Sequence, residues 1–231
     1  GLFLRSKTLI GKKLSTIGLI LTFFPIAVAL APDLEKWIED KRYNTFVDEV
    51  KFNKEMTVLI AYSENKKETN YTIPESVTSI GKYAFYGCTS LTSITIPDSV
   101  TSIGKYAFKS CTSLTSIRIP DGVTSIEDFA FFNCNSLTSI TIPDSVTSIG
   151  ERGFYQCIKL TSINVGVGNL NYSDIDGVLF NKEKTLLHTY PADKTGANYT
   201  IPDSVTSIGR GSFFQCTSLT SITIGSSVTS I

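Results

Sequence analysis

The chain repeats one unit with a fixed period, and this limits its fold more than any other feature. The unit is close to Ile-Pro-Asp-Ser-Val-Thr-Ser-Ile-Gly, followed by Ala-Phe, a cysteine and Ser-Leu-Thr-Ser-Ile-Thr. It starts four times at intervals of 23 residues and returns once later, at Ile73, Ile96, Ile119, Ile142 and Ile201. Such a period is typical of solenoids, in which each unit buries its apolar side only against its neighbours. We therefore predict a stack of coils.

The composition agrees with a folded repeat protein. Of the 231 residues, 42% are hydrophobic and 18% are charged, and the formal net charge at pH 7 is zero. Disordered chains contain fewer hydrophobic residues, and nucleic-acid-binding domains carry an excess of Lys and Arg. The composition therefore excludes a disordered tail and indicates that nucleic acid is not a partner.

Each unit contains the pattern of a strand with one buried face. Apolar Ile117 and Ile119 alternate with polar Ser116 and Arg118, a period of two that is typical of strands. A second short extended piece follows, and the Ala-Phe pair predicts a helical or 3₁₀ corner that places Phe in the core. The predicted core consists of two ladders, Phe85, Phe108, Phe131, Phe154 and Phe213, and Leu91, Leu114, Leu137, Leu160 and Leu219.

One cysteine occupies the same place in every unit: Cys88, Cys111, Cys134, Cys157 and Cys216. Equivalent residues of neighbouring coils lie about 4.8 Å apart, a separation that permits a disulfide. However, side chains in register point in parallel, and the number of cysteines is odd. We predict small buried thiols that pack the corner, with disulfide pairing or metal and redox chemistry as alternatives.

These residues resemble a known family. The Leu-x-x-Ile-x-Ile-Pro strand, the Ile-x-x-x-Ala-Phe corner and the cysteine before the next strand resemble the BspA-like leucine-rich repeats over residues 50–231. The resemblance implies a leucine-rich-repeat solenoid of 23-residue units. It also implies an adhesive or binding module of the kind found on bacterial and protist surfaces and in algal genomes. Because buried residues define this family, the resemblance identifies the fold and leaves the partner open.

Two segments interrupt the regular period, and they match each other. Residues 52–59, Phe-Asn-Lys-Glu-Met-Thr-Val-Leu, recur 128 residues later at 180–187 as Phe-Asn-Lys-Glu-Lys-Thr-Leu-Leu. In both copies, residues with a preference for strands flank a polar turn. We therefore predict β-hairpins inserted near residues 50–61 and 177–190.

The sequence offers little for catalysis. The single histidine, His188, corresponds to Ile60 in the first copy, which favours a surface or packing position over a general base. No phosphate-binding glycine loop or nucleophile elbow is present in the sequence. Asp174, Gly177 and Glu183 are similar to part of a calcium loop, but a plain turn is the preferred interpretation. We predict no catalytic residues, no cofactor and no metal.

The N-terminal segment, residues 1–31, combines basic residues with an uncharged apolar run over residues 14–31. This pattern predicts a single membrane-spanning helix, with a cleaved signal peptide as the alternative. The basic flank would place the repeats on the non-cytoplasmic face, at the cell surface or in an organelle lumen such as the thylakoid. The predicted membrane contacts are Leu19, Ile20, Leu21, Phe23, Phe24 and Trp37.

Two further expectations concern the boundaries of the repeats. Residues 32–49 are expected to form a short amphipathic helix or an N-terminal cap, followed by the solenoid over residues 50–231. The last unit stops at its midpoint. We expect that more repeats follow Ile231 in a longer protein.

The outward positions of the strands form the candidate interaction face. It is a strip of small polar groups with one cation, and the alternative interpretation is solvated strand residues selected for β-propensity. The hairpins, the open ends of the solenoid and the variable corner residues Tyr86, Lys109, Phe132 and Tyr155 are further candidates. The interaction face comprises Ser93, Thr95, Ser116, Arg118, Ser139, Thr141, Ser162, Asn164, Ser221 and Thr223.

Three functional hypotheses follow. The favoured one is a non-enzymatic protein-interaction or scaffold module, anchored in a membrane and contacting membrane subunits or surface proteins, including as an accessory subunit of a membrane complex. The second is a secreted cell-surface adhesin that binds host protein or glycan. The third is ice binding, because regular Ser-x-Thr rows on a flat sheet can match a lattice.

Overall fold

The computed structural model describes residues 44–231, and every regular element in that part of the chain is a β-strand. The predicted hydrophobic helix over residues 1–31 and most of the predicted helix or cap over residues 32–49 lie outside the described residues. The predicted membrane contacts also lie outside them, and these are Leu19, Ile20, Leu21, Phe23, Phe24 and Trp37.

The described chain begins with a three-stranded antiparallel meander. Strand β1 (Asn44–Val47) pairs with β2 (Val50–Asn53), which in turn pairs with β3 (Val58–Tyr62). Residues 44–47 therefore form a strand and not part of a helix. The antiparallel pair expected near residues 50–61 is present, but it belongs to a larger unit with one more strand.

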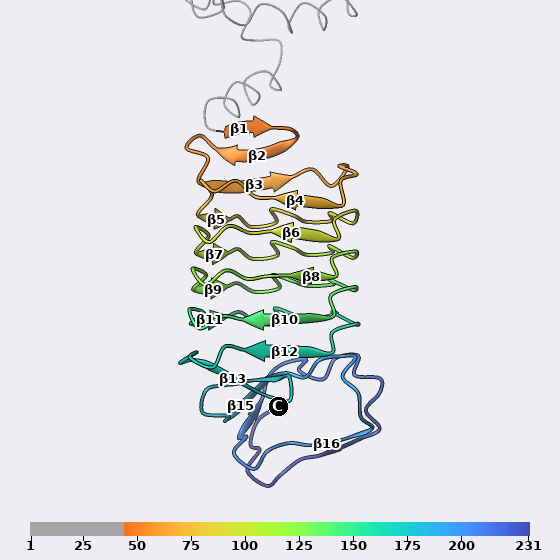
Figure 1. Ribbon diagram of the computed structural model, residues 1–231. Helices are drawn as coiled ribbons and strands as arrows, with labels where there is room; N and C mark the ends of the chain where they lie inside the picture. The colour runs from red at the N-terminus through yellow and green to blue at the C-terminus, as the bar shows by residue number, and fades with distance from the viewer. Residues whose placement is uncertain (1–43) are drawn as a thin grey trace, which may run out of the picture. The chain divides into compact units, whose positions relative to one another are not determined.

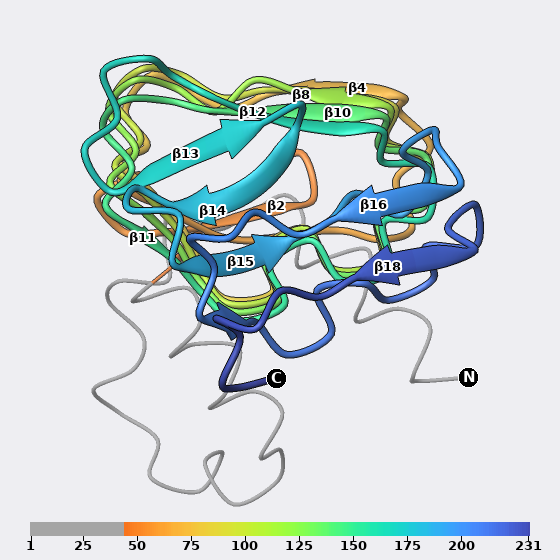
Figure 2. The same cartoon turned by 90° about the horizontal axis from the view of Figure 1, so that it is seen from below.

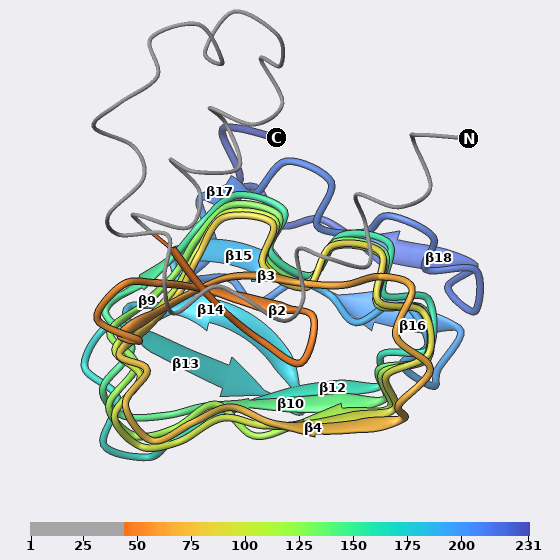
Figure 3. The ribbon, with the colours of Figure 1, turned by 90° about the horizontal axis from the view of Figure 1, so that it is seen from above.

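Regular coils follow, and each coil contributes one strand to each of two sides. In the first sheet the order is β1-β2-β3-β5-β7-β9-β11, with β5 (Ser79–Ile80), β7 (Ser102–Ile103), β9 (Ser125–Ile126) and β11 (Ser148–Ile149). On the other side lie β4 (Asn70–Thr72), β6 (Ser93–Thr95), β8 (Ser116–Ile117), β10 (Ser139–Ile142) and β12 (Ser162–Val165). Strands β4-β6-β8 form one sheet and β10-β12 another. Figure 1 shows these coils stacked on one another, and Figure 3 shows that their outlines superpose.

The predicted alternation within each strand is confirmed. Ile117 and Ile119 are buried, whereas Ser116 and Arg118 are exposed. The Phe ladder is confirmed over four coils, because the ring centroids of Phe85, Phe108, Phe131 and Phe154 follow one another at 5.2, 5.1 and 5.7 Å with nearly parallel planes.

The corners are turns, so the expectation of a helical or 3₁₀ corner is wrong. A helix would satisfy every backbone group within the segment, but here bonds within a turn, such as Ala84 N–H to the carbonyl of Gly81 at 3.2 Å, alternate with bonds between coils. The N–H of Phe85 donates to the carbonyl of Ala107 at 2.7 Å, and the N–H of Phe108 donates to the carbonyl of Ala130 at 2.8 Å. Two residues per corner adopt a positive φ: Tyr83, Tyr106, Phe129 and Arg152 at 54–60°, and Gly87, Ser110, Asn133 and Gln156 at 61–71°.

A second meander interrupts the stack after β12. It consists of β13 (Tyr172–Ile175), β14 (Val178–Asn181) and β15 (Leu186–Thr189), again in antiparallel order. A new short stack continues from it, with β15 paired to β17 (Ser207–Ile208) and β16 (Asn198–Thr200) paired to β18 (Ser221–Thr223). We refer to residues 44–171 as the first block and to residues 172–231 as the second block. Figure 2 shows the meander and the strands of the second block beside the end of the first stack.

The core divides at the same place. One apolar cluster extends from Val50 to Leu179, and a second contains Val178, Phe180, Leu187 and residues after them. Phe213 belongs to the second cluster with Leu219 and Cys216, so the prediction of single Phe and Leu ladders through all five units is wrong. The reason is that the second meander starts a new stack instead of adding a coil to the old one.

The second block repeats the geometry at the start of the first. In the first block, Tyr62 lies 4.8 Å from Tyr71 and 5.4 Å from Phe85, measured between ring centroids. Their counterparts 128 residues later are Tyr190, Tyr199 and Phe213, where the same distances are 4.8 and 5.3 Å. The two meanders are thus equivalent starting units of two stacks.

The cysteines are free thiols that pack the corners as predicted. Cys88, Cys111, Cys134 and Cys157 are buried, and Cys216 is partly buried. The Sγ of Cys111 donates to the carbonyl of Phe85 at 3.0 Å, and Cys134 donates to Phe108 at 3.1 Å. Each thiol thus contributes to the contact between one coil and the preceding one.

Candidate functional site

The first block brings eight of the ten predicted face residues together. Strands β6, β8, β10 and β12 follow one another, and the pairs that they form are in register, so that Ser93 lies opposite Ser116 and Ser139 lies opposite Ser162. The backbone at these positions is held by the sheet, and the side chains point outward because the alternate residues fill the core. The result is a polar outer face made of hydroxyl groups, Asn164 and Arg118.

The second block does not extend this face. Ser221 and Thr223 lie on β18, whose partner is β16 in a separate sheet, and the described residues of β18 are exposed on both sides. The prediction that they continue the row is wrong, because the second meander separates β12 from β18. Their row in the second block consists of Asn198, Thr200, Ser221 and Thr223.

Arg118 crosses the outer face to reach two carboxylates. Its Nη1 lies 2.9 Å from Asp98 Oδ1, and its Nη2 lies 3.5 Å from Asp121 Oδ2. All three side chains are largely exposed, so solvent screens the network and it adds little to stability. Beside it, an open groove is lined by Arg118, Thr141 and Asp144 among other residues. Arg118 is therefore partly neutralised and less available as a binding cation than the sequence suggests.

The corners carry an aromatic surface that the sequence analysis mentioned only among the further candidates. Tyr83, Tyr106 and Phe129 stack at centroid distances of 4.9 and 5.0 Å. A second row next to them consists of Tyr86, Lys109, Phe132 and Tyr155, in which the Nζ of Lys109 lies 5.2–5.4 Å from the centroids of three rings. Tyr83 is 42% exposed and Tyr86 is 45% exposed. We call these seven residues the aromatic corner.

The fixed spacing of the coils explains the aromatic corner. Equivalent residues of stacked coils are held at about the strand spacing of 4.8 Å, which suits offset stacking of aromatic rings and contacts between cations and rings. A signal for this surface was present in the sequence, because Tyr or Phe recurs before the Ala-Phe pair. It was missed because only the variable residues that follow the Ala-Phe pair were considered.

At the junction between the blocks, side chains take the place of a strand. The N–H of Ile149 at the free edge of β11 donates to the Oη of Tyr172 at 2.7 Å. The N–H of Val165 at the end of β12 donates to Asp174 Oδ1 at 2.8 Å, and the N–H of Gly177 donates to Asp174 Oδ2 at 3.2 Å. These side chains satisfy the backbone groups that the next coil would otherwise pair.

Asn169 closes the loop that leads from β12 into the junction. Its side chain is fully buried and makes four hydrogen bonds. The amide nitrogen donates to the carbonyls of Pro143 and Val146 at 2.8 and 3.0 Å, and the amide oxygen accepts from the N–H groups of Asn171 and Tyr172 at 2.8 Å. The buried amide therefore fixes the start of the second meander.

His188 has a packing role, as the sequence predicted. Its ring lies edge-on to Tyr172 with 6.3 Å between the ring centroids, and its Nδ1 lies 2.9 Å from Thr189 Oγ1. Burial lowers the pKa of His188, and a hydrogen bond with the Ile149 backbone partly opposes this. The first copy has Asn44 and Ile60 in the places of Tyr172 and His188. The two blocks therefore differ at the residues that contact β11.

The described residues offer neither a cluster of metal ligands nor a membrane-spanning helix. Between Asn44 and Ile231, no three His, Cys, Asp or Glu residues are grouped in a way that suits a metal ion. The carboxylate of Asp174, which was considered as a calcium ligand, instead accepts the two backbone hydrogen bonds described above. The same part of the chain contains no helix of the length and apolarity that a membrane crossing requires.

Comparisons with solved structures identify similar solenoids. A leucine-rich repeat protein from Eubacterium ventriosum is 29% identical, with a TM-score of 0.63, over 80% of this chain and 60% of that one. One from Bacteroides ovatus is 27% identical, with a TM-score of 0.51, over 81% and 57%. The pneumococcal vaccine antigen PcpA shares the fold at 22% identity and a TM-score of 0.62, over 80% and 60%. This chain thus spans about 60% of the length of the first two similar chains.

Comparison of the sequence with protein families identifies one family. The profile of the BspA type leucine-rich repeat region matches six copies, over residues 60–186 and 193–231. No curated protein matches the chain. The two matched ranges cover most of the chain and include the coils of both blocks. The chain therefore belongs to the family of BspA-type leucine-rich repeat proteins.

Proposed function

We propose that this solenoid is a non-enzymatic protein-interaction module and that the aromatic corner is its main contact surface. Protein interfaces are enriched in Tyr, Phe and Arg at their centres, and a few such residues contribute most of the binding energy. The polar outer face offers hydroxyl groups whose individual contributions are small. The single observation that carries the proposal is the exposure of Tyr83 and Tyr86 within an ordered stack of rings.

Order in the aromatic corner favours binding. The rings of Tyr83 and Tyr106 are parallel within 3°, and Lys82 and Lys105 lie 5.2 and 5.6 Å from the rings beside them. Side chains that are already fixed lose little entropy when a partner binds. We therefore expect the partner to contact the exposed edges of these rings, with acidic groups near the two lysines. The outer face, from Ser93 to Asn164, would contribute weaker polar contacts.

We further propose that the protein is anchored in a membrane through residues 1–31, with the repeats on the non-cytoplasmic face. The uncharged run over residues 14–31 and its basic flank support this topology. The partners would be membrane subunits, for which this chain is an accessory subunit, or surface proteins. In the alternative, the segment is removed and the repeats act as a secreted adhesin for host protein or glycan. N-terminal sequencing of the mature chain distinguishes the two topologies.

Site-specific cross-linking tests the interaction surface. A photoreactive amino acid is placed in the full chain at Tyr83 in one sample and at Thr141 on the outer face in another, and both are irradiated in the native membrane. We expect a defined cross-linked product from position 83, and we expect a Tyr106→Ala substitution in the next coil of the same corner to weaken it. A product that forms only from position 141 would show that the outer face is the binding surface instead. No product from either position would refute a protein-binding role for both surfaces.

A further inference from the structure

The junction between the blocks contains two guanidinium groups without a carboxylate partner. Arg152 ends the first stack of corners, and Arg210 belongs to the second block. Both line a cavity of about 250 Å³, together with Glu151 and His188. In the part of the chain that the structure describes, no carboxylate oxygen lies within 4.0 Å of either guanidinium. Two like charges thus share one cavity.

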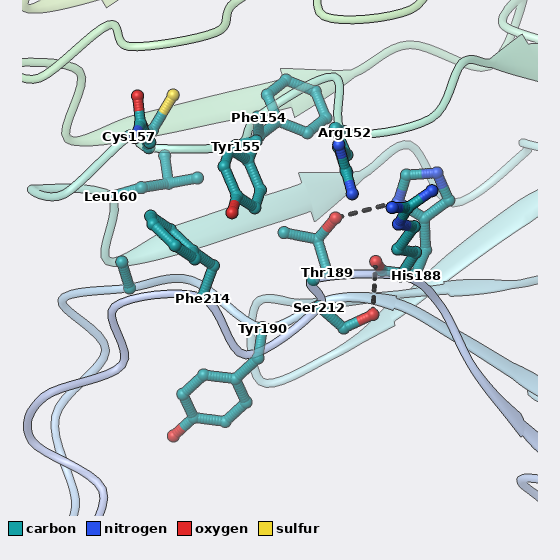
Figure 4. A pocket seen from close by; sticks show the side chains of 14 residues that line it. Arg152, Phe154, Tyr155, Cys157, Leu160, His188, Thr189, Tyr190, Ser212 and Phe214 are labelled. Atoms are coloured by element: carbon teal, nitrogen blue, oxygen red, sulfur yellow. Dashed lines mark hydrogen bonds between the residues drawn. The ribbon is translucent and has the colours of Figure 1, made fainter. Parts of the chain in front are cut away.

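Arg152 is held in place but is not satisfied. Its guanidinium carbon lies 5.8 Å from the ring centroid of Phe129 and 5.3 Å from that of Tyr155. Its Nε is buried and has no hydrogen-bond partner. A buried charged donor without an acceptor costs free energy, and an anion held against the accessible part of the same guanidinium would offset this cost electrostatically. Figure 4 shows the guanidinium of Arg152 directed toward Thr189 and His188, at a smaller pocket that Arg210 also lines.

The cavity forms because the row of stacked rings in the corner ends at the junction. In earlier coils Tyr83, Tyr106 and Phe129 stack on one another, and Arg152 occupies the next position. The residue that follows in this row is Gly211, with a φ of +73°, where an added Cβ would lie 2.8 Å from the Cε2 of Tyr155. Gly211 therefore supplies no ring to stack on Arg152.

The ion pair that joins equivalent positions of neighbouring coils is also absent at the junction between the blocks. Lys105 and Asp128 occupy equivalent positions of neighbouring coils, and their side chains lie 3.0 Å apart. The corresponding pair across the junction is Glu151 and Arg210, whose charged atoms are more than 4.0 Å apart. Burial lowers the pKa of His188, which disfavours the charged form of its ring. The two arginines and Glu151 give the cavity a net positive charge.

We propose that this cavity binds a tetrahedral oxyanion, sulfate or phosphate, between Arg152 and Arg210. The planar guanidinium presents parallel N–H donors that match two oxygens of such an ion. The anion would accept from the guanidinium N–H groups of Arg152 and Arg210 that line the cavity, and it would join the two blocks because its ligands come from both. The same chemistry is available as a free ion or as a sulfate or phosphate ester.

Calorimetry and thermal unfolding of the full chain test the proposal. Sodium sulfate and sodium phosphate are titrated at constant ionic strength, with sodium chloride as the reference ion. We expect saturable binding of sulfate or phosphate, with a rise in Tm that chloride does not produce. Glucose 6-sulfate and glucose 6-phosphate distinguish the source, because they bind only if the cavity accepts an esterified group. Equal effects of chloride and sulfate would refute the site.

Four variants assign the binding to these residues. R152Q and R210Q should each weaken binding about tenfold or more, because each removes charged hydrogen bonds. E151Q should tighten binding, since it removes the opposing charge. Lys82→Gln is the matched control, a corner cation outside the cavity, and should leave affinity unchanged. If R152Q fails to fold, Arg152→Lys keeps the charge and should still weaken binding. Unchanged affinity in Arg210→Gln, or equal loss in Lys82→Gln, would overturn the assignment.

Discussion

The rings of Tyr155 and Phe214 stack with their centroids 4.0 Å apart, although the whole second meander lies between them in the sequence. The Phe residues next to them in the sequence lie in two different cores. Phe154 ends the ladder of the first core, and the partly buried Phe213 packs against the second core. The second row of the aromatic corner, which runs from Tyr86 to Tyr155, therefore continues across the junction in Phe214, whereas the core does not. Contact between the blocks rests on this pair, on Leu179 in the first apolar cluster, and on backbone bonds such as the one from the N–H of Ile163 to the carbonyl of Gly177 at 2.8 Å.

The first prediction concerns this pair. Phe214→Ala removes an aromatic contact worth about 0.5–1.5 kcal/mol beyond its buried area. We expect faster hydrogen exchange in the amides of β15 and β17 and no change in those of β7 and β9. Tyr86→Ala, which removes a ring of the same row away from the junction, is the control. Equal acceleration in both blocks would show that the stack does not join them specifically.

The second prediction concerns the edge of β11. Tyr172→Phe deletes the hydroxyl that accepts from the N–H of Ile149, leaving that group without a partner at a cost of about 1–3 kcal/mol. Urea unfolding should show this loss, and the exchange protection of the Ile149 amide should fall. Tyr83→Phe removes an exposed hydroxyl and should change stability little. A loss no larger in Tyr172→Phe than in Tyr83→Phe would contradict the edge-capping role.

The third prediction compares a buried and a surface ring in successive coils. Phe108 is fully buried between Phe85 and Phe131, so Phe108→Ala should destabilise the first block by about 3–5 kcal/mol. Phe132→Ala in the aromatic corner should cost much less, because its ring is only partly buried. Chemical denaturation of the two variants tests the difference. Similar losses would mean that the corner is part of the core.

The fourth prediction is a loss of stability in alkali. Burial raises the pKa of Cys216 to about 11, and it raises the pKa of Tyr62 and Tyr199 to about 12. These groups stay neutral in the folded chain but ionise at their ordinary pKa of 9.0 and 10.0 once it unfolds. Their contribution to stability is therefore complete below pH 9 and is lost as the pH rises toward 12.

Urea midpoints measured across this pH range test the fourth prediction. They should be constant from neutral pH to 9 and should then fall. Cys216→Ala should flatten the first part of the decrease, whereas Tyr83→Phe should not alter the profile. A midpoint that stays constant up to pH 11 would show that the buried thiol and phenols are not protected.

Much of the fold could be predicted from the sequence, because buried residues repeat with a fixed period. The alternation at Ile117 and Ile119 and the thiol of Cys134 depend only on the coil in which they lie. The outer strands of the meanders could not be found in this way, since Asn44–Val47 and Tyr172–Ile175 differ in sequence. Backbone pairing, which many sequences permit, holds these strands in place.

The candidate site was harder to predict, because it depends on how coils follow one another. Ser221 matches Ser162 in its unit, but the meander places it in another sheet. The aromatic corner depends on backbone bonds between coils, such as the one from Phe85 to Ala107, and on a positive φ at Tyr83. These features are set by neighbouring coils and are not visible in a single unit.

The second meander has a mechanical consequence. Asp174 and Tyr172, on the edge strand β13 of the later sheet, seal the end of the first stack with bonds to the N–H groups of Val165 and Ile149. A force applied to Ile231 would therefore peel β18, β17 and β16 away first and stop at this seal. The molecule should lengthen in two separate steps under load, so that the first stack resists tension after the second has come apart.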